Sequence, residues 1–320
     1  MTHTILIDIG GTNTRVGLAQ DGVLADDSIL RFRNAEFAGL DAVITAYFNK
    51  KGTIDLAGAC VDIAGPVQNG VGTLTNLDWT LTEPKIATWT GAGKALLIND
   101  LQAQGHGVAD LPPESLFEVE IGRETGEARA ETRLVVNVGT GFNAAVVYDT
   151  DGLRHVPPSE AGHANLPVRN AADLRLLQFV ETAHGFPAIE DVLSGRGLER
   201  VYQWLNHEIG RDARLTGADI IAQCNEGDEI AAKAVRVFTR FFGTVSGNLS
   251  LEHLPFGGVY LVGGVACALA PLLKTMGFVE AFRDKGRFAS LVDQFSVYVI
   301  KDDYAALRGA SRHLHAVLQK

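Results

Sequence analysis

Short apolar runs and glycine-rich turns alternate at the start of the chain. Residues 5–9 are apolar apart from Asp8, residues 10–13 read Gly-Gly-Thr-Asn, and residues 14–19 again have the composition of a strand. The pattern predicts a strand, a tight turn and a second strand.

Helix and strand patterns then alternate along the rest of the chain. Helical periodicity first occurs at 39–50, and strand composition returns at 56–63 and 95–98. Charged, amphipathic segments dominate 170–206 and 216–248, which predicts a mostly helical second half. The alternation favours an α/β fold.

The opening pattern occurs twice. When the sequence is aligned with itself so that residue 134 falls on residue 5, two similar segments coincide. Each is an apolar run whose fourth residue is polar, followed by a glycine turn. Asp8 then falls on Asn137 and Gly10 on Gly139, and β-rich residues 144–148 follow the second turn. Such a repeat suggests two related halves that face a common cleft.

Two other segments decide the organisation of the chain. Residues 110–133 contain Pro112, Pro113 and a cluster of charges with glycines, so we place a domain boundary near their start. Residues 254–273 carry no charge, but four glycines interrupt them, which predicts a strand at 259–262 and a helix from about Ala266. A membrane span is therefore not expected there.

Composition narrows the class of function. The chain has 28 basic and 38 acidic side chains, a net charge of −10, which argues against nucleic acid or an anionic membrane as a partner. The three cysteines are widely separated and suit neither a disulfide framework nor a zinc site. Since the first residues also lack a basic leader, we expect a cytoplasmic location.

The first glycine turn is a candidate phosphate site. Glycine allows close approach and positive φ, and successive amides can form a concavity that binds anions. The turn leads into a strand, so it is neither a P-loop nor a dinucleotide fingerprint, and a plain hairpin turn is the alternative. Asp8 favours the phosphate site, because a carboxylate on an apolar strand needs a partner such as hydrated Mg²⁺. The alternative for Asp8 is an exposed edge strand.

Three further groups carry candidate chemistry. Asn99 and Asp100 end a strand, where ligands bind in open α/β sheets, although Asp is also a favoured helix cap. Glu160 and His163 lie in a loop after two prolines, and Glu190 precedes a glycine turn. Carboxylates and an imidazole on loops can bind polyols, while a solvated Glu and a structural His are the alternatives.

At these residues the sequence resembles the bacterial glucokinase family, which belongs with the sugar kinases, actin and the heat-shock ATPases. The resemblance covers nearly the whole chain and rests on six motifs in the family's order. The motifs are Asp8-Ile9-Gly10-Gly11-Thr12-Asn13, Ile98-Asn99-Asp100, Val138-Gly139-Thr140-Gly141, Glu160-Ala161-Gly162-His163, Glu190 with residues 192–195, and Val262-Gly263-Gly264-Val265.

The resemblance implies a two-domain actin-like ATPase fold, related to ribonuclease H, with a cleft between the domains. Residues 1–111 would form the small domain, with a C-terminal helix at about 301–320 packed onto it, and residues 112–300 the large one. The implied reaction is ATP-dependent phosphorylation of glucose at its 6-hydroxyl. A kinase for mannose or an amino sugar and a non-catalytic sugar sensor are the alternatives.

The resemblance also implies roles for the motif residues. Asp100 would be the catalytic base, and Asn99, Asp100, Glu160, His163 and Glu190 would hold the sugar. ATP would lie against residues 8–13, Gly139, Thr140, Gly141, Gly263 and Gly264, with Mg²⁺ held by Asp8 through water. The family also implies a homodimer.

The chain departs from the family pattern at two places. Glycine is expected shortly after the second Gly-Thr-Gly, where this chain has Phe142 and Asn143, and also at Ala161. Since asparagine and glycine can both adopt positive φ, we expect Asn143 to have that conformation and to tolerate replacement by Gly. The cysteine cluster of the related repressor and kinase group is absent from the sequence, which favours the glucokinase branch.

Overall fold

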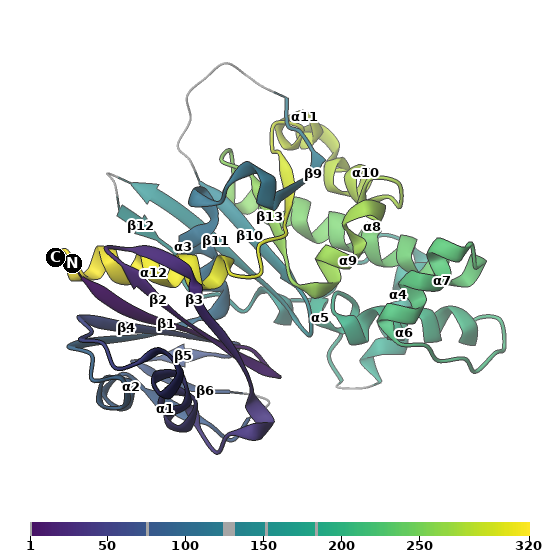
Figure 1. Cartoon of the computed structure of the whole chain (residues 1–320). Helices are drawn as coiled ribbons and strands as arrows, with labels where there is room; N and C mark the ends of the chain where they lie inside the picture. The colour runs from purple at the N-terminus through teal and green to yellow at the C-terminus, as the bar shows by residue number, and fades with distance from the viewer. Residues whose placement is uncertain (1, 75–76, 124–131, 151–152, 183–184) are drawn as a thin grey trace. The chain divides into compact units, whose positions relative to one another are not determined.

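The computed structural model describes residues 2–74, 77–123, 132–150, 153–182 and 185–320, and its contacts divide the chain into two compact units (Figure 1). The first unit comprises Met1–Leu111 and Asp302–Lys320, and the second comprises Pro112–Lys301. The first unit is therefore built from both ends of the chain.

A five-stranded sheet in the order β3-β2-β1-β4-β8 forms the centre of the first unit. Its strands are β1 (His3–Ile9), β2 (Asn13–Gln20), β3 (Val23–Arg33), β4 (Gly58–Ile63) and β8 (Lys94–Asn99). β1 pairs antiparallel with β2 and parallel with β4, and β4 is parallel to β8. A small sheet of β5 (Val67–Gln68), β6 (Val71–Thr73) and β7 (Thr80–Thr82) accompanies it.

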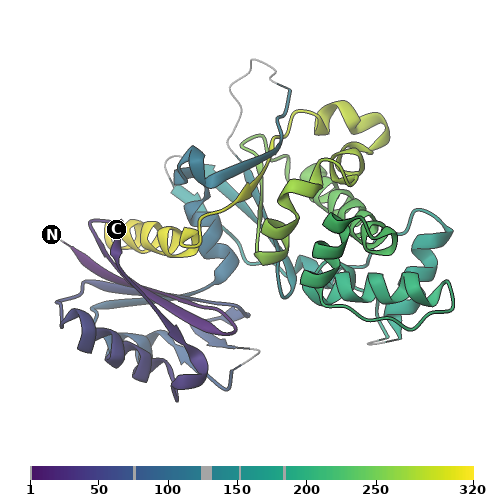
Figure 2. The same ribbon diagram turned by 45° about the vertical axis from the view of Figure 1, so that its right-hand side comes forward.

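Helices cover both faces of the large sheet (Figures 1 and 2). These helices are α1 (Leu40–Lys51), α2 (Glu83–Thr90), α3 (Asp100–Gly107) and α12 (Ala305–Leu318). Successive residues of β1 point to opposite faces, so Ile5 and Ile7 pack with α1 and α2, whereas Leu6 packs with α3 and α12. A Cβ added at Gly309 of α12 would lie 1.7 Å from the Ala103 carbonyl oxygen of α3, so only glycine permits this contact.

The second unit repeats the same strand plan in a six-stranded sheet, β12-β11-β10-β13-β14-β9. Its strands are β9 (Leu116–Glu120), β10 (Arg133–Val138), β11 (Phe142–Thr150), β12 (Leu153–His155), β13 (Val259–Val262) and β14 (Val297–Ile300). β10 and β11 form an antiparallel hairpin, and β10 is parallel to β13 as β1 is to β4. The predicted pair of strand, turn, strand units is confirmed.

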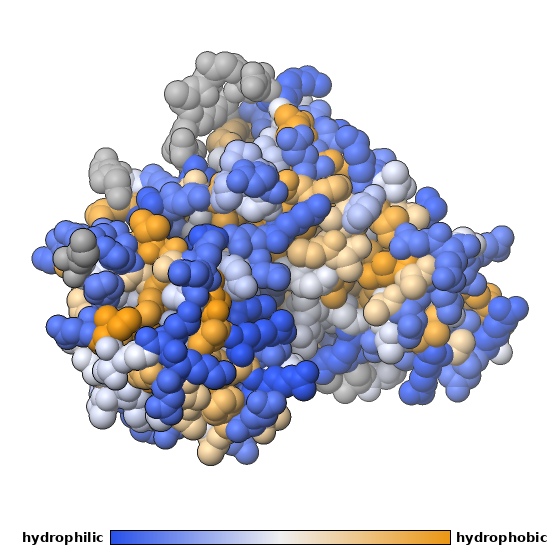
Figure 3. All heavy atoms as spheres, viewed as in Figure 1, coloured by the Kyte–Doolittle hydropathy of each residue, from blue (hydrophilic) through white to orange (hydrophobic). Residues whose placement is uncertain are grey.

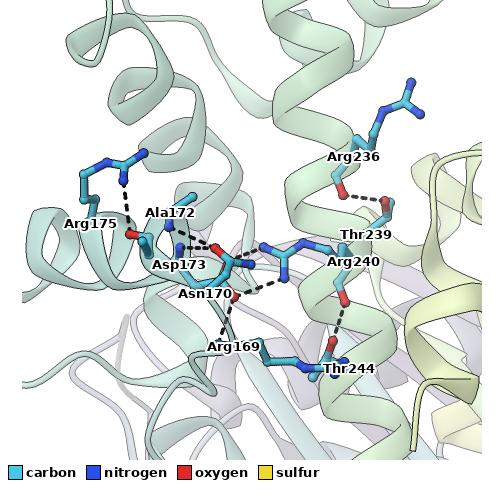
Figure 4. A network of polar contacts seen from close by, with 10 residues as sticks. Arg169, Asn170, Ala172, Asp173, Arg175, Arg236, Thr239, Arg240 and Thr244 are labelled. Atoms are coloured by element: carbon cyan, nitrogen blue, oxygen red, sulfur yellow. Dashed lines mark hydrogen bonds and ion pairs between the residues drawn. The ribbon is translucent and has the colours of Figure 1, made fainter.

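Helices supply most of the core of the second unit (Figure 2). They are α4 (Ala171–Glu181), α5 (Ile189–Val192), α6 (Gly195–His207), α7 (Gly217–Glu226), α8 (Glu229–His253), α9 (Gly264–Leu273), α10 (Phe278–Arg283) and α11 (Ala289–Val292). Figure 4 shows how α4 is tied to α8: Arg240 donates to the buried carboxylate of Asp173, whose backbone amide is capped by Asn170.

The segment 254–273 contains the predicted strand and helix, but the helix begins at Gly264, two residues before the predicted start, and includes Pro271. In the described part of the chain, no helix combines the length and apolar character that a membrane crossing requires. On the face drawn in Figure 3, apolar side chains lie in groups among many hydrophilic ones.

Candidate functional site

The parallel strands of the first unit bring acidic residues to one edge of its sheet. Asp8 lies near the end of β1, opposite Asp62 on β4, and β8 ends at Asn99. Because β1 lies inside the sheet and Asp8 is only 8% exposed, the edge-strand alternative for Asp8 is wrong. Its Oδ2 accepts a hydrogen bond from Arg15 Nη1 at 2.7 Å, so a guanidinium partly offsets the buried charge.

Asp62 is a site residue that our reading of the sequence missed. It is fully buried, and neither carboxyl oxygen accepts a hydrogen bond from a donor in the described part of the chain. Burial and the nearby charges of Asp8 and Asp100 raise the pKa of Asp62 well above its usual value. A carboxylate inside an apolar strand was the signal used for Asp8, and it applied equally to Asp62.

Asn99 and Asp100 join β8 to α3, and Asn99 caps the helix. Asn99 is the N-cap of α3: its Oδ1 accepts from Leu101 N at 2.9 Å, and Gln102 Oε1 accepts from Asn99 N at 3.2 Å. Asn99 Nδ2 also donates to the Gly65 carbonyl at 3.1 Å. The cap alternative for Asp100 is therefore wrong, since Asn99 holds that position.

Asp100 has an unusual protonation equilibrium. Burial raises its pKa to about 7, with a further contribution from the charge of Asp8, although Leu101 N donates to its Oδ1 at 2.8 Å. A carboxyl with a pKa near neutrality can accept a proton and release it again. That property suits a general base, whose optimum pKa lies near the working pH.

Residues 10–13 form the turn of the β1–β2 hairpin. Gly10 N donates to Asn13 O at 3.0 Å, and Gly11 and Thr12 are exposed. Buried Asn34 braces the turn, because its Nδ2 donates to the Gly10 carbonyl at 2.8 Å. The segment is a hairpin turn, and Gly10 and Gly11 do not adopt positive φ. Glycine at these positions therefore serves to let a ligand approach the backbone closely.

The second glycine turn, Gly139 to Gly141, lies against two other glycine-rich segments. Gly195 N donates to the Gly139 carbonyl at 2.9 Å. Gly263 has φ +97°, and a Cβ there would lie 2.4 Å from Asn137 Oδ1. Gly264 begins α9 beside Gly139. The structure thus brings the predicted second phosphate loop and the predicted adenosine motif close together within the second unit.

The three predicted sugar-binding residues of the second unit also lie close together. His163 and Glu190 line a cavity of about 340 Å³, whose other lining residues are Phe186, Ala188, Asp191, Ser194, Arg196 and Arg200. Glu160 Oε2 lies 3.9 Å from His163 Nε2, and both side chains are exposed. Glu190 Oε2 accepts from Phe142 N at 2.9 Å, which fixes this carboxylate beside the second glycine turn.

Neither Arg200 nor Asn143 was assigned a role from the sequence. Arg200 Nη1 donates to Asp191 Oδ1 at 2.7 Å and forms one wall of the cavity. Asn143 does not adopt positive φ, so our expectation for its conformation is wrong: it is a residue of β11 paired with Asn137. Its side chain binds the loop that carries Glu160.

Comparisons with known proteins identify the family of the chain. A family model described as glucokinase matches residues 5–317. A glucokinase of Rhizobium leguminosarum bv. trifolii is 31% identical over 96% of this chain and 89% of its own length. The crystal structure of a glucokinase from an Antarctic psychrotroph is 26% identical, with a TM-score of 0.85 over 99% of both chains.

A ROK family glucokinase from Streptomyces griseus, solved in complex with glucose and AMPPNP, shares the fold. It is 18% identical and covers 97% of this chain and 98% of its own, with a TM-score of 0.66. The predicted actin-like two-domain fold is confirmed.

Proposed function

Because the chain belongs to the glucokinase family, we propose that it transfers a phosphoryl group from ATP to the 6-hydroxyl of glucose, giving glucose 6-phosphate and ADP. The observation that carries the proposal is Asp100, a carboxyl at the end of a parallel strand with a pKa of about 7. The crystal structure of the S. griseus glucokinase with glucose and AMPPNP supports glucose and ATP as substrates.

Asp100 is proposed to accept the proton of the 6-hydroxyl as its oxygen attacks the γ-phosphorus. The enzyme's part in phosphoryl transfer is mostly positioning and charge stabilisation, so the base contributes by orienting the hydroxyl as well as by taking its proton. Asn99 is held by the Gly65 carbonyl and by its capping bonds. It would offer the sugar a rigid amide group next to the base.

Glu160, His163 and Glu190 are proposed to bind the remaining sugar hydroxyls. Ionised carboxylates accept hydrogen bonds only, so each can accept hydrogen bonds from two neighbouring hydroxyls. Glu190 is held by the Phe142 amide, and a carboxylate fixed in this way loses little conformational freedom when the sugar binds. The imidazole of His163, in the same loop as Glu160, can donate or accept a hydrogen bond to a sugar hydroxyl.

The glycine turns are proposed to bind ATP through backbone amides. The first set is Asp8, Ile9, Gly10, Gly11, Thr12 and Asn13, and the second is Gly139, Thr140, Gly141, Gly263 and Gly264. Exposed Gly11 and Thr12 leave their backbone open to a ligand, and Gly263 has the positive φ that a tight turn before α9 requires.

The charge at the sheet edge fits a divalent cation. The carboxyls of Asp8, Asp62 and Asp100 interact with one another, and the guanidinium of Arg15 interacts with those of Asp8 and Asp62. Within the described ranges, no group of three or more His, Cys, Asp or Glu side chains could hold a metal ion directly. A Mg²⁺ site built from one or two carboxylates with water and phosphate needs no such group, and Asp8 would hold the ion through water. Bound Mg²⁺ would offset the negative charge of the phosphates.

Two further properties belong to the proposal. All three cysteines, Cys60, Cys224 and Cys267, are free thiols, which supports the cytoplasm as the compartment. The family resemblance supports a homodimer, and light scattering that gives a monomer throughout the micromolar range would contradict that assembly.

The decisive experiment is an ADP-release assay with a panel of sugars at saturating ATP. We expect turnover with glucose and, by mass spectrometry and NMR, a product phosphorylated at the 6-position. Turnover restricted to mannose or an amino sugar would assign a different hexose kinase. Sugar binding by calorimetry without any consumption of ATP would indicate a sensor and refute the kinase.

A further inference from the structure

Asn143 occupies a special register in the second hairpin. In the first hairpin Asp8 pairs with Arg15, and in the second Asn137 pairs with Asn143. Asn143 therefore takes the place that Arg15 has in the first unit. Arg15 binds back to Asp8 across the strand pair, whereas Asn143 sends its side chain to a different segment.

That segment is the backbone on either side of Glu160. Asn143 Nδ2 donates to the Ser159 carbonyl at 2.6 Å, and its Oδ1 accepts from Ala161 N at 3.0 Å. Its Oδ1 also accepts from Ala144 N at 2.8 Å, which holds the amide group in one orientation. The carbonyl before Glu160 and the amide after it are thus bound by one side chain.

The loop continues from this contact into the short helix of residues 161–163. His163 N donates to Glu160 O at 3.1 Å, and Gly162 packs so closely that an added Cβ would lie 2.1 Å from the Phe142 carbonyl oxygen. The neighbouring Phe142 amide holds Glu190. Two consecutive residues of β11 therefore fix both acidic contacts proposed for the sugar, Phe142 through its backbone and Asn143 through its side chain.

We propose that Asn143 is a positioning residue for the hexose: its side-chain amide fixes the loop that carries Glu160 and His163 and so sets the affinity for the sugar. The proposal rests on the proposed function. A glycine at this position would have no side chain to make these bonds.

The test compares Asn143→Gly and Asn143→Ala with the wild type in glucose kinetics at saturating ATP. Two hydrogen bonds to the Glu160 loop, each of ordinary net strength, are among those lost, so we expect the KM for glucose to rise about tenfold. The kcat should stay within about threefold, because Asn143 touches neither the base nor the phosphate, and the KM for ATP should not change. Asn143→Asp keeps the acceptor for Ala161 N and loses the donor, so we expect an intermediate KM.

The matched control is Asn170→Ala. Asn170 also accepts from two backbone amides in the same unit, at the start of α4, and its loss removes a helix cap. We expect a lower thermal midpoint for Asn170→Ala with an unchanged KM for glucose. A general loss of stability is thereby separated from a loss of sugar positioning.

Hydrogen exchange without substrate gives a readout that does not depend on activity. We expect the Ala161 amide to exchange faster in Asn143→Ala than in the wild type. If the Gly and Ala variants do not fold, the KM of Asn143→Asp for glucose carries the test, because that variant loses only the donor to Ser159. An unchanged KM for glucose or unchanged exchange at Ala161 would overturn the inference. A wild type that phosphorylates no sugar would instead overturn the proposed function.

Discussion

Replacement of Asp100 by Asn tests two effects of this carboxyl, its contribution to turnover and its effect on the stability of the fold. The substitution keeps the shape of the side chain and removes its ability to accept a proton. Since Asn99, not Asp100, caps α3, the helix start should be unaffected. A general base contributes about 10²–10⁴ to rate, so we expect turnover to fall by at least ~10².

The same change should stabilise the fold at neutral and alkaline pH. Burial raises the pKa of Asp100 from 3.8 to about 7, so the folded state holds the proton more tightly than the unfolded state. The wild type therefore loses stability as the pH rises from about 4 to about 7, and the loss is constant above that range. A difference of three pKa units corresponds to at most about 4 kcal/mol, and partial solvent exposure reduces this to about 2 kcal/mol.

Two measurements check this reasoning. Urea unfolding of both proteins at pH 4 and pH 8 should give equal stabilities at the acid end and a more stable Asp100→Asn variant at the alkaline end. The wild-type kcat should increase with pH through about 7, as Asp100 loses its proton, and the residual activity of the variant should lack this limb. Near-normal turnover would refute the base, and equal stability at pH 8 would refute the raised pKa.

Three other substitutions test the rest of the site. Asp62→Asn removes a carboxyl whose pKa burial raises, so we expect greater stability than the wild type in urea near pH 8, and no gain near pH 4. A loss of stability at pH 8 would contradict the raised pKa. Gly11→Val and Thr140→Val should each weaken ATP binding measured by calorimetry. The first substitution blocks the approach of a phosphate to the backbone, and the second removes a hydroxyl donor. Unchanged ATP affinity in both variants would rule out the two phosphate loops. Gly141→Ala places a Cβ 2.5 Å from Glu190 Oε2 and should displace that carboxylate. The KM for glucose should therefore rise, while the KM for ATP should change less. An unaltered KM for glucose would show that sugar binding does not depend on the present position of Glu190.

Elements that depend on local pattern could be predicted from the amino-acid sequence alone. Residues 5–9 and 134–138 are strands because each apolar run ends in a glycine turn, and the two hairpins fall where the repeat predicts them. Asp8 and Asp100 were found for the same reason, since a carboxylate in or directly after an apolar strand is conspicuous in the sequence.

Which of these residues come into contact depends on how distant strands pair in the folded protein. Asp62 joins Asp8 because β4 pairs with β1 in parallel, and a pairing between strands some fifty residues apart is not encoded in the local pattern of either strand. The register of the second hairpin likewise placed Asn143 within a strand, where its side chain reaches Ser159 and Ala161, instead of in the turn with positive φ. The pKa of Asp100 depends on burial by the whole unit and on the charge of Asp8, and both exist only once the sheet has formed.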